Sequence, residues 1–390
     1  MNKTHISHNI DKVAESLKED VIKWRRQFHR HPEPSNQETE TSLMVQQILT
    51  SFDIPFTTAA ETGIIAEIKG SGNPIIGLRT DMDALPIKEE TSLDFASENE
   101  GFMHACGHDA HMAIAAGVMA VFSRINNLPF SLRCIFQPAE ESIPSGALRM
   151  IKEGVLKEMK YLVGFHVWPG LEIGTFMVGQ GRVTACVDSF DILIQGRSGH
   201  GASPHKTIDP IVAAAYFISQ MQTIVSRKSD PQAPLVISVG KISGGDVYNV
   251  IPEQVQIVGT VRSFDPKQNK LAETHIQKLL KGLEKGFGVK THINYHGFIP
   301  AVYNEPALAK KIACILSSSF GKRAVIVDEK TGMEGDDFSF YSNIIPSCYI
   351  KIGCGKSAYS HHSNKFNIDE ACLVIAIKAL SRILWEIAEL

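Results

Sequence analysis

The chain lacks three features that would place it in a large, easily recognised class of protein. No apolar run approaches the ~20 residues that a membrane-spanning helix needs, and the opening residues MNKTHISHNIDKVAES contain no apolar core of the kind that a secretory signal requires. Basic residues form no block, and 39 Lys and Arg against 42 Asp and Glu give a formal charge of −3. Because nucleic acid is bound through clustered positive charge, we expect neither a nucleic acid nor a membrane as partner.

Paired cysteines are also missing. The seven cysteines are odd in number and scattered, with no CxxC pair. In a chain without a secretory signal, this pattern favours reduced thiols over a disulfide framework. We therefore expect a cytoplasmic protein.

The pattern that is present is one of strands alternating with helices. Ile10, Val13, Leu17, Val21 and Phe28 keep a helical period as far as HPEP, and a second helix is expected at 38–51. Beyond them, short apolar runs such as PIIGLRTD alternate with helical segments such as DAHMAIAAGVMAVFSRI. This alternation predicts an α/β fold with a mostly parallel sheet flanked by helices.

A second pattern interrupts the first one. Its elements follow the split βαβ, or ferredoxin-like, order of strand, helix, strand, strand, helix and strand. In chain order they are the strand DSFDILIQG, a helix, the strands PLVISVGKI and EQVQIVGTV, a helix over 266–286 and the strand VKTHINYHG. From about residue 305 the first pattern resumes, with a helix, strands AVIVDE and SCYIKIG, and a closing helix over 368–389. At 390 residues the chain is longer than a single core usually grows. We therefore predict one domain from 1–184 plus 299–390 and an inserted α+β domain at 185–298.

Candidate metal ligands recur where the predicted strands end. The stretch HACGHDAHM, residues 104–112, holds three histidines, a cysteine and an aspartate in nine positions. Ligands of open α/β sheets bind outside the carboxyl ends of the strands, so loops from distant segments would meet there. These loops carry Asp81 and Asp83, Cys106, His108, Asp109 and His111, Glu140 and Glu141, His166, and His361 and His362. Their coincidence indicates a metal site; Asp109 is expected to cap its helix, and at most one of the tandem histidines is expected to act.

Other kinds of site remain open at this point. A structural zinc site usually has two local pairs of Cys or His ligands, and only one such cluster is present. Cys106, at a helix start beside histidines, fits an activated nucleophile, although a cysteine hydrolase needs neither Glu140–Glu141 nor His166. A silent binding protein is a further alternative. A metal centre uses the whole set, because a divalent ion lowers the pKa of a water it binds towards ~7 and a neighbouring glutamate can take the proton.

With these residues in hand, the chain resembles the two-metal aminoacylase/carboxypeptidase family. The likeness is to its N-acyl-amino-acid amidohydrolase branch, which includes hippurate hydrolases and auxin-conjugate hydrolases. It rests on RTDMDALPI, MHACGHDAHMA, FQPAEE, GFHVWP, GRSGHGASPH, YNVIP and HHSNKF, which occur in the family's order over essentially the whole chain. The resemblance implies a metallopeptidase-like catalytic domain and an inserted lid and dimerisation domain.

The resemblance also implies roles for single residues. The implied ligands of two divalent ions are Cys106, which bridges them, His108, Glu141, His166 and His362. Glu140 would be the general base and acid, and Asp83 would orient the site.

In the inserted domain, the resemblance makes His200 the group that stabilises the oxyanion, donated across the subunit interface in dimeric relatives. Asn249 and Arg262 match positions near the substrate's carboxylate and acyl groups. The implied enzyme is a homodimer that hydrolyses N-acyl amino acids with Mn²⁺ or Zn²⁺, or with Co²⁺ or Ni²⁺, all of which suit a mixed thiolate, imidazole and carboxylate set.

Two motifs depart from the family pattern near the expected pocket. HHSNKF has no proline two residues after its second histidine, and MEGDDFS replaces the commoner Ser-Glu before Asp-Phe. Substrate preference therefore carries over less safely than the metal site. The alternatives within the family are a dipeptidase or carboxypeptidase and a deacetylase of acetylated diamino acids.

Overall fold

The computed structural model describes residues 3–72, 74–327, 332–356 and 359–390 and divides into two compact units. Unit 1 contains the chain as far as Gly181, a segment that begins at Tyr303, and Asp337–Leu390. Unit 2 contains Arg182–Val302 and a short segment that ends at Asp336. The inserted domain was expected at 185–298 from the sequence, and the short segment was not expected in unit 2. It is held there because Ala185 N donates to Glu334 O at 2.8 Å.

Unit 1 is built on an eight-stranded mixed sheet with strand order β1-β2-β4-β3-β5-β16-β6-β15. The central pairs β4–β3, β3–β5 and β5–β16 are parallel, as is β6–β15, while the other pairs are antiparallel. The strands are β1 (Phe56–Ala59), β2 (Gly63–Ile68), β3 (Ile75–Asp81), β4 (Ser131–Gln137), β5 (Met159–Trp168), β6 (Phe176–Met177), β15 (Val325–Ile326) and β16 (Ser347–Gly353). This confirms the predicted α/β fold. All seven residues of β3 are buried, as expected for a parallel strand covered on both faces.

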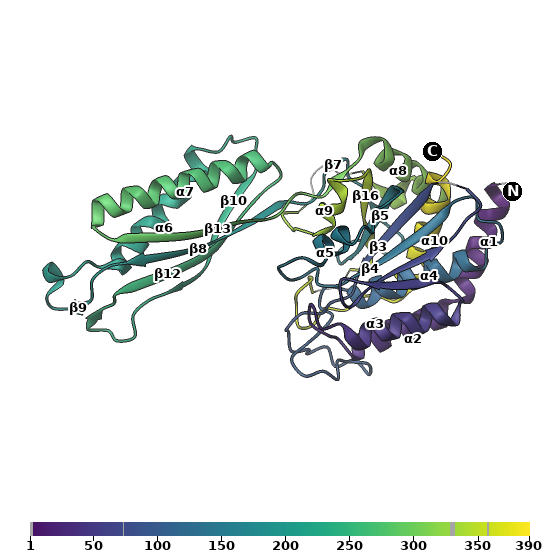
Figure 1. Ribbon diagram of the computed structural model, residues 1–390, viewed down its shortest axis with the longest axis horizontal. Helices are drawn as coiled ribbons and strands as arrows, with labels where there is room; N and C mark the ends of the chain where they lie inside the picture. The colour runs from purple at the N-terminus through teal and green to yellow at the C-terminus, as the bar shows by residue number, and fades with distance from the viewer. Residues whose placement is uncertain (1–2, 73, 328–331, 357–358) are drawn as a thin grey trace. The chain divides into compact units, whose positions relative to one another are not determined.

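Helices cover this sheet (Figure 1). They are α1 (Lys3–Ser16), α2 (Lys18–Arg30), α3 (Thr39–Ser51), α4 (His108–Ser123), α5 (Gly146–Lys152), α8 (Pro306–Phe320), the 3-10 turn η2 (Lys322–Ala324), α9 (Phe338–Ser342) and α10 (Ala371–Ile387). Helix α4 is buried over nearly its whole length and packs against α2 and α10. Its alanines and Gly117 allow close approach, since a Cβ on Gly117 would lie 2.4 Å from Ile377 Cδ1. Each fully buried Val, Ile or Met side chain of this core contributes roughly 1.5–3 kcal/mol.

Two predictions for unit 1 need adjustment. The single N-terminal helix expected through Leu17 is two helices, because the chain turns at Leu17, whose N–H donates to Ala14 O at 3.2 Å. Both helices keep their apolar faces on the core, so the period continues across the break. Of the expected strand AVIVDE, β15 comprises only Val325–Ile326, and the last two residues of that stretch lie outside the described residues.

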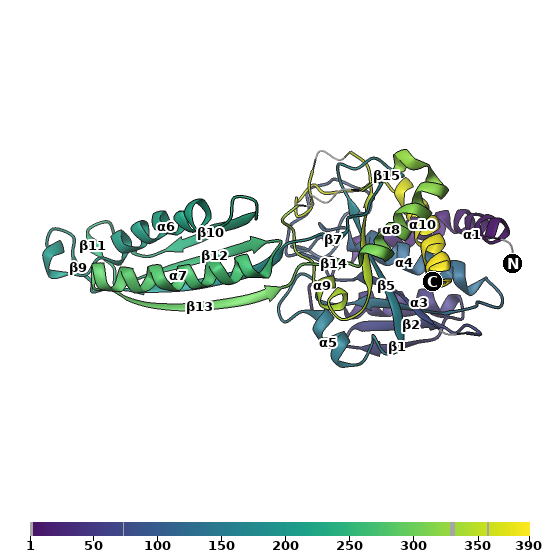
Figure 2. The same ribbon diagram turned by 90° about the horizontal axis from the view of Figure 1, so that it is seen from above.

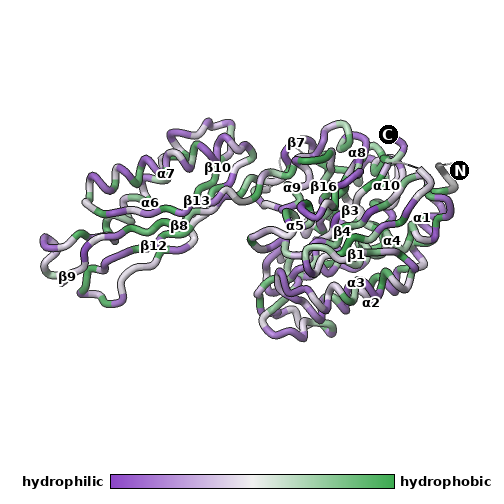
Figure 3. The backbone as a smooth tube through the Cα atoms, viewed as in Figure 1, coloured by the Kyte–Doolittle hydropathy of each residue, from purple (hydrophilic) through white to green (hydrophobic). Residues whose placement is uncertain are grey.

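Unit 2 has a four-stranded antiparallel sheet of order β10-β12-β8-β13 with two helices on one face (Figures 1 and 2). Its elements are β8 (Cys186–Gln195), α6 (Pro210–Arg227), β10 (Leu235–Ser243), β12 (Gln254–Ser263), α7 (Pro266–Phe287) and β13 (Lys290–Ile299). Strand, helix, strand, strand, helix, strand with this order is the ferredoxin-like arrangement. The colours of α7 alternate along its length, as expected of a helix with one buried face (Figure 3).

Short elements complete the chain. They are β9 (Gly199–His200), the 3-10 turn η1 (Pro204–Lys206) and β11 (Val250–Ile251) in unit 2, and β7 (Gly181–Arg182) and β14 (Tyr303–Asn304), which pair with each other. Helices α6 and α7 start at Asp-Pro steps, where Asp209 and Asp265 accept hydrogen bonds from first-turn N–H groups and proline occupies the first helical position. None of the helices in the described part of the chain is long and apolar enough to cross a membrane.

Candidate metal centre

The carboxyl ends of the parallel strands β3, β4 and β5 lie next to one another in unit 1 (Figure 1). Asp81 ends β3, Glu140 and Glu141 follow β4, and His166 lies near the end of β5. Cys106 and His108 come to the same place at the start of α4, and their ligand atoms cluster with those of His166. The expected convergence of distant loops is therefore present.

Two groups of possible ligand atoms share Cys106. One group is Cys106, His108 and His166, and the other is Cys106, Glu141 and His362; within each group the ligand atoms lie within 4.8 Å of one another. His166 Nε2 is 3.4 Å from Cys106 Sγ, and His362 Nε2 is 3.2 Å from Glu141 Oε1. The structure thus brings together all five side chains expected to bind metal, around one thiol that could contact two ions.

Unusual backbone conformations make this convergence possible. Gly107, between Cys106 and His108, has φ +88°, and a Cβ there would lie 2.6 Å from Val167 Cγ2. Only glycine meets both demands readily. Two other residues of the site region have positive φ, Ala139 at +52° just before Glu140 and His362 at +64°, and His362 N donates to Ala105 O at 2.9 Å. Positive φ in residues other than glycine is uncommon and often marks functional sites.

Hydrogen bonds set the orientation of two of the imidazoles. His108 Nδ1 donates to Asp83 O at 2.8 Å, and His166 Nδ1 donates to Val167 O at 2.8 Å. Each ring therefore turns Nε2 toward the site, the nitrogen through which a histidine held in this way binds metal.

The buried polar atoms of the site fit a cation. His108 Nε2 and Glu141 Oε1 are buried and have no hydrogen-bond partner among the described residues, although His362 Nε2 lies close to that glutamate oxygen. Buried polar atoms without partners are costly, and a divalent ion would satisfy them. The donor set of one thiolate, imidazoles and carboxylate suits a first-row transition metal.

The electrostatics of the site agree with this reading. Burial lowers the pKa of His108, but the carboxylates of Asp81 and Asp83 outweigh it and raise that pKa to about 10. Burial, with the nearby rings of His111 and His361, lowers the pKa of His166 well below its usual value, which keeps it neutral. Carboxylates that attract a proton to His108 would attract a cation as well, and the cation would displace the proton.

The same electrostatics disfavour a metal-free cysteine nucleophile. Burial and the carboxylates of Glu141 and Glu140 raise the pKa of the Cys106 thiol well above its usual value. Reactive cysteines have a lowered pKa in electropositive surroundings. Without a cation, Cys106 would be protonated and a poor nucleophile at neutral pH.

Asp83 connects the two halves of the site. Its carboxylate accepts hydrogen bonds from Glu140 N at 3.1 Å, from Glu141 N at 2.9 Å and from Ser35 Oγ at 2.6 Å, while its backbone oxygen holds His108. One buried aspartate therefore holds the backbone of both glutamates and the ring of a possible ligand.

Asp109 does not cap α4, contrary to expectation. The N-cap is Gly107, with no side-chain hydrogen bond, and the Asp109 carboxylate instead accepts from Arg25 Nε and His29 Nδ1, both at 2.8 Å. All three side chains are about 1% exposed. Asp109 therefore anchors α4 to α2, a role that its sequence position did not reveal because Arg25 and His29 are some 80 residues away.

A further set of contacts near the site was not foreseen. Asp337 is fully buried and accepts hydrogen bonds from Arg79 at 2.7 Å, Gln137 at 2.7 Å and Ser145 at 2.6 Å. These bonds fix the start of α9 to the ends of β3 and β4. The only signal in the sequence was the unusual MEGDDFS motif, in which Asp337 is the second aspartate.

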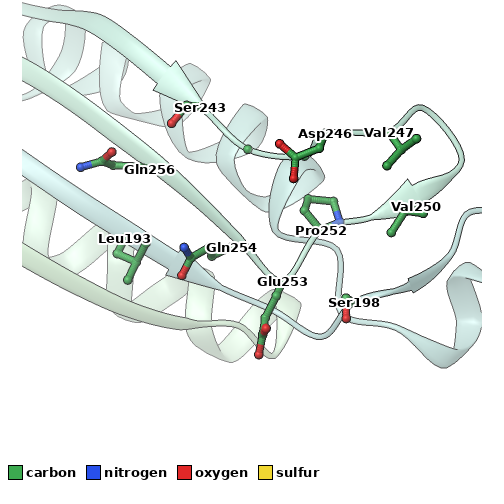
Figure 4. A pocket seen from close by; sticks show the side chains of 12 residues that line it. Leu193, Ser198, Ser243, Asp246, Val247, Val250, Pro252, Glu253, Gln254 and Gln256 are labelled. Atoms are coloured by element: carbon green, nitrogen blue, oxygen red, sulfur yellow. The ribbon is translucent and has the colours of Figure 1, made fainter.

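In unit 2, His200 and Asn249 lie together on the ribbon formed by β9 and β11. His200 pairs with Val250, and Gly201 N donates to Asn249 O at 2.8 Å. Beside this ribbon is a pocket of about 690 Å³, lined by residues such as Asp246, Val247, Val250 and Glu253 (Figure 4).

Arg262 lies elsewhere in unit 2. It is near the other end of β12, about 27 Å from Gln254 at ~3.4 Å per residue, and its Nη1 donates to Met333 O at 2.8 Å. The structure therefore does not bring Arg262 to the ribbon that carries His200 and Asn249.

The fold and the clustered ligands of unit 1 define a hydrolase-like metal centre at the edge of an α/β sheet. The chain matches the family described as "Peptidase family M20/M25/M40" over residues 77–386, and it belongs to this family. Its relatives are hydrolases that cleave amide bonds, so the expected amidohydrolase class is confirmed.

Several relatives match most of the chain. The chain is 37% identical over 360 residues to an N-acetylcysteine deacetylase of Bacillus subtilis, covering 91% of this chain and 93% of the relative. It is 39% identical to an N-acyl-L-amino acid amidohydrolase of Geobacillus stearothermophilus, covering 76% and 81%. It is 35% identical to an N-acetyldiaminopimelate deacetylase of Priestia megaterium, covering 93% and 97%.

A solved structure supports the fold. A Bacillus subtilis protein described as a dinuclear metal-binding peptidase of the M20 family superposes with a TM-score of 0.83 at 32% identity, covering 96% of this chain and 99% of that one.

Proposed function

We propose that this protein hydrolyses the amide bond of N-acyl amino acids, releasing a carboxylic acid and a free amino acid. The observation that carries the proposal is the pair of ligand groups that share Cys106 Sγ beside Glu140. This arrangement would hold two divalent ions, which would supply an activated water, and the adjacent carboxylate suits the proton transfers that amide hydrolysis needs.

The residues that would hold the two ions are Cys106, His108, Glu141, His166 and His362, and Cys106 belongs to both groups of possible ligands. When bound, the ions would lower the pKa of a water and polarise the acyl carbonyl. The donor set suits Mn²⁺ or Zn²⁺, and also Co²⁺ or Ni²⁺.

Glu140 is proposed as the group that moves protons. One of its carboxylate oxygens lies within 4.8 Å of ligand atoms of His108 and Glu141, so it sits at the edge of the ligand set. There it would take a proton from the attacking water and return it to the leaving amine. Asp83 would keep Glu140 in place through the hydrogen bond from Glu140 N.

His200 is proposed to stabilise the negative charge that develops on the acyl oxygen. Ala202 N donates to His200 Nδ1 at 3.0 Å, so the neutral ring carries its proton on Nε2. That tautomer makes Nε2 a hydrogen-bond donor, which an oxyanion requires. Asn249, next to His200, would contact the substrate, while Arg262 lies near the other end of β12 and donates to Met333 O.

Unit 2 is also proposed as the surface through which a homodimer forms. Large apolar side chains are exposed on it, including Ile211 at 44%, Ile242 at 53%, Val247 at 55% and Tyr248 at 99%. An exposed group of this kind, rimmed by polar residues, is typical of an interaction surface. We further propose a cytoplasmic location, because all seven cysteines are free thiols and such thiols persist in a reducing compartment.

The second candidate is a deacetylase specific for one acetylated amino acid. Two of the relatives are named for N-acetylcysteine and N-acetyldiaminopimelate. The same residues of the metal centre would carry out this reaction, so only the substrate pocket distinguishes the two candidates.

A hydrolysis screen on metal-stripped protein reloaded with each ion tests the proposal. The panel contains N-acetyl, N-benzoyl and longer N-acyl amino acids together with dipeptides. We expect no activity after stripping, recovery with at least one divalent ion, and hydrolysis of N-acyl amino acids. Full activity in the metal-stripped protein would contradict the proposal. Activity on dipeptides alone would show that the substrates are dipeptides and not N-acyl amino acids.

A further inference from the structure

Three histidine rings surround the backbone of Val167, at the end of β5. Val167 N donates to His111 Nε2 at 3.0 Å. Val167 O accepts from His166 Nδ1 at 2.8 Å and from His361 Nε2 at 2.9 Å. His111 and His166 are buried, and His361 is partly buried, so these bonds are shielded from water.

The hydrogen bonds determine the tautomer of His111. Because Nε2 accepts a hydrogen bond from Val167 N–H, its lone pair is occupied, and the ring proton must be on Nδ1. His111 Nδ1 lies 2.6 Å from Asp81 Oδ1 and donates to it, while Arg79 Nη1 donates to the other oxygen of Asp81 at 2.6 Å. Asp81 is thus held between a guanidinium and an imidazole.

These imidazoles replace a missing strand partner. The recorded pairing of β5 with β3 runs as far as Gly164 opposite Arg79, and β3 ends at Asp81. Val167 therefore lies beyond the ladder on that side, where its N–H and C=O would be left unpaired. Buried backbone groups must be satisfied, and His111 and His361 supply the partners.

Asp81, His108 and His111 also form a group with ligand atoms within 4.8 Å of one another, which invites reading His111 as a metal ligand. Both ring nitrogens of His111 are already used by Asp81 and Val167, so no lone pair remains for an ion.

We propose that the Asp81–His111 pair and His361 are positioning residues that fix the Val167 peptide and thereby the ring of His166. His166 depends on Val167 twice, through the chain and through the bond from its Nδ1 to Val167 O. The rings of His111 and His361 also pack edge-to-face on His166, with centroids 4.4 Å and 4.7 Å away. This gives the first tandem histidine, His361, a role distinct from that of His362, and it rests on the proposed function because it assumes that His166 binds metal.

The first test compares three variants with the same substitution, His111→Phe, His361→Phe and His104→Phe. His104 is the control, since it is a buried histidine of the same motif whose ring nitrogens have no partner among the described residues. Partners that orient a metal ligand typically change metal affinity by 10–100-fold. Binding of Mn²⁺ and Zn²⁺ to metal-stripped protein is measured by calorimetry, and the melting temperature of the stripped protein is measured in parallel.

We expect His111→Phe to weaken one of the two ions by 10–100-fold, His361→Phe to weaken the same ion less, and His104→Phe to bind as the wild type does. If His111→Phe does not fold, His361→Phe carries the test. Wild-type affinity for both ions in His361→Phe and in any folded His111→Phe overturns the inference. Variants that melt earlier but bind both ions normally also overturn it, because they show a structural role alone.

Nitrogen NMR of histidine-labelled, metal-stripped wild-type protein gives an independent readout. The His111 signals should show a protonated Nδ1 and an unprotonated Nε2, and the opposite tautomer would overturn the inference. Wild-type protein that binds no ion would instead refute the proposed metal centre, so the two failures are distinguishable.

Discussion

The proposed ligands of unit 1 are mostly buried: Cys106, His108 and His166 are no more than 9% exposed, and backbone oxygens hold both histidines. In unit 2, by contrast, His200 and Asn249 are exposed on a two-stranded ribbon. His362, with a side chain 54% exposed, is the one proposed ligand that resembles the residues of unit 2. It lies in a loop rather than at a strand end.

The difference in burial matches the role proposed for each group. Metal ligands work when their geometry is preset and their orientation is supported by further hydrogen bonds. A group that stabilises the transition state can be exposed to solvent in the free enzyme and become ordered when substrate binds. Substitutions of the metal ligands and buried anchors of unit 1 should therefore change metal binding or stability, while substitution of His200 in unit 2 should change turnover alone.

The largest effect is expected from Glu140→Gln. Loss of the proton-transfer group should lower kcat by about 10²–10⁴-fold with little change in metal content. The matched variant Glu141→Gln, one residue away, should instead lose metal affinity. Steady-state kinetics and elemental analysis of both proteins check this contrast, and Glu140→Gln with wild-type kcat would break it.

The next effect concerns the anchor of α4. Asp109→Asn removes the charged partner of the buried Arg25 Nε, while Glu370 Oε1 still lies 3.2 Å from Arg25 Nη1. Breaking a buried ion pair typically costs about 3–5 kcal/mol of unfolding free energy, and we expect the lower end of that range here. Urea unfolding measures this cost, and Asp94→Asn, at an exposed site, should change stability by less than about 0.5 kcal/mol.

The same carboxylate predicts a pH dependence. Burial raises the pKa of Asp109, but Arg25 and His29 outweigh it and hold that pKa far below its usual range. A lowered folded pKa gives stability that is fully present above the unfolded value of about 3.9 and is lost as pH falls towards the folded value. Asp109→Asn should therefore lose part of the acid sensitivity of the wild type, and an unchanged acid profile would contradict this assignment.

A somewhat smaller effect is expected from His200→Ala in unit 2. Removing one donor to an oxyanion typically lowers kcat by about 10²–10³-fold. Because His200 is exposed, metal affinity and unfolding free energy should not change. His205→Ala, an exposed histidine five residues along, is the control and should retain wild-type kcat; a drop in metal content of His200→Ala would erase the distinction between the units.

The smallest effect separates Asn249 from Arg262. Asn249→Ala should raise KM several-fold, since a lost hydrogen bond is worth about 0.5–1.5 kcal/mol. Arg262→Ala also breaks the bond to Met333 O, so it should lower the stability of unit 2. An Arg262→Ala protein with wild-type stability and a raised KM would place Arg262 at the substrate instead.

The alternation of apolar runs predicted both sheets and the insertion, because strand and helix periods report which faces are buried. The predicted catalytic clustering followed from one rule, that parallel strands end at the same edge. Periodicity shows which face of an element is buried, but it does not show which side chains or backbone groups will form hydrogen bonds. The break at Leu17 and the pairing of Asp109 with Arg25 and His29 were therefore not predicted. Strands of two residues, such as β9 and β11, are too short to show a period at all.

The measurement that tests the central claim most directly is a count of bound ions with their positions, by elemental analysis and anomalous diffraction on reconstituted protein. We predict two divalent ions per chain, with Cys106 Sγ in contact with both. A single ion, no ion, or two ions that do not share this sulfur would contradict the account.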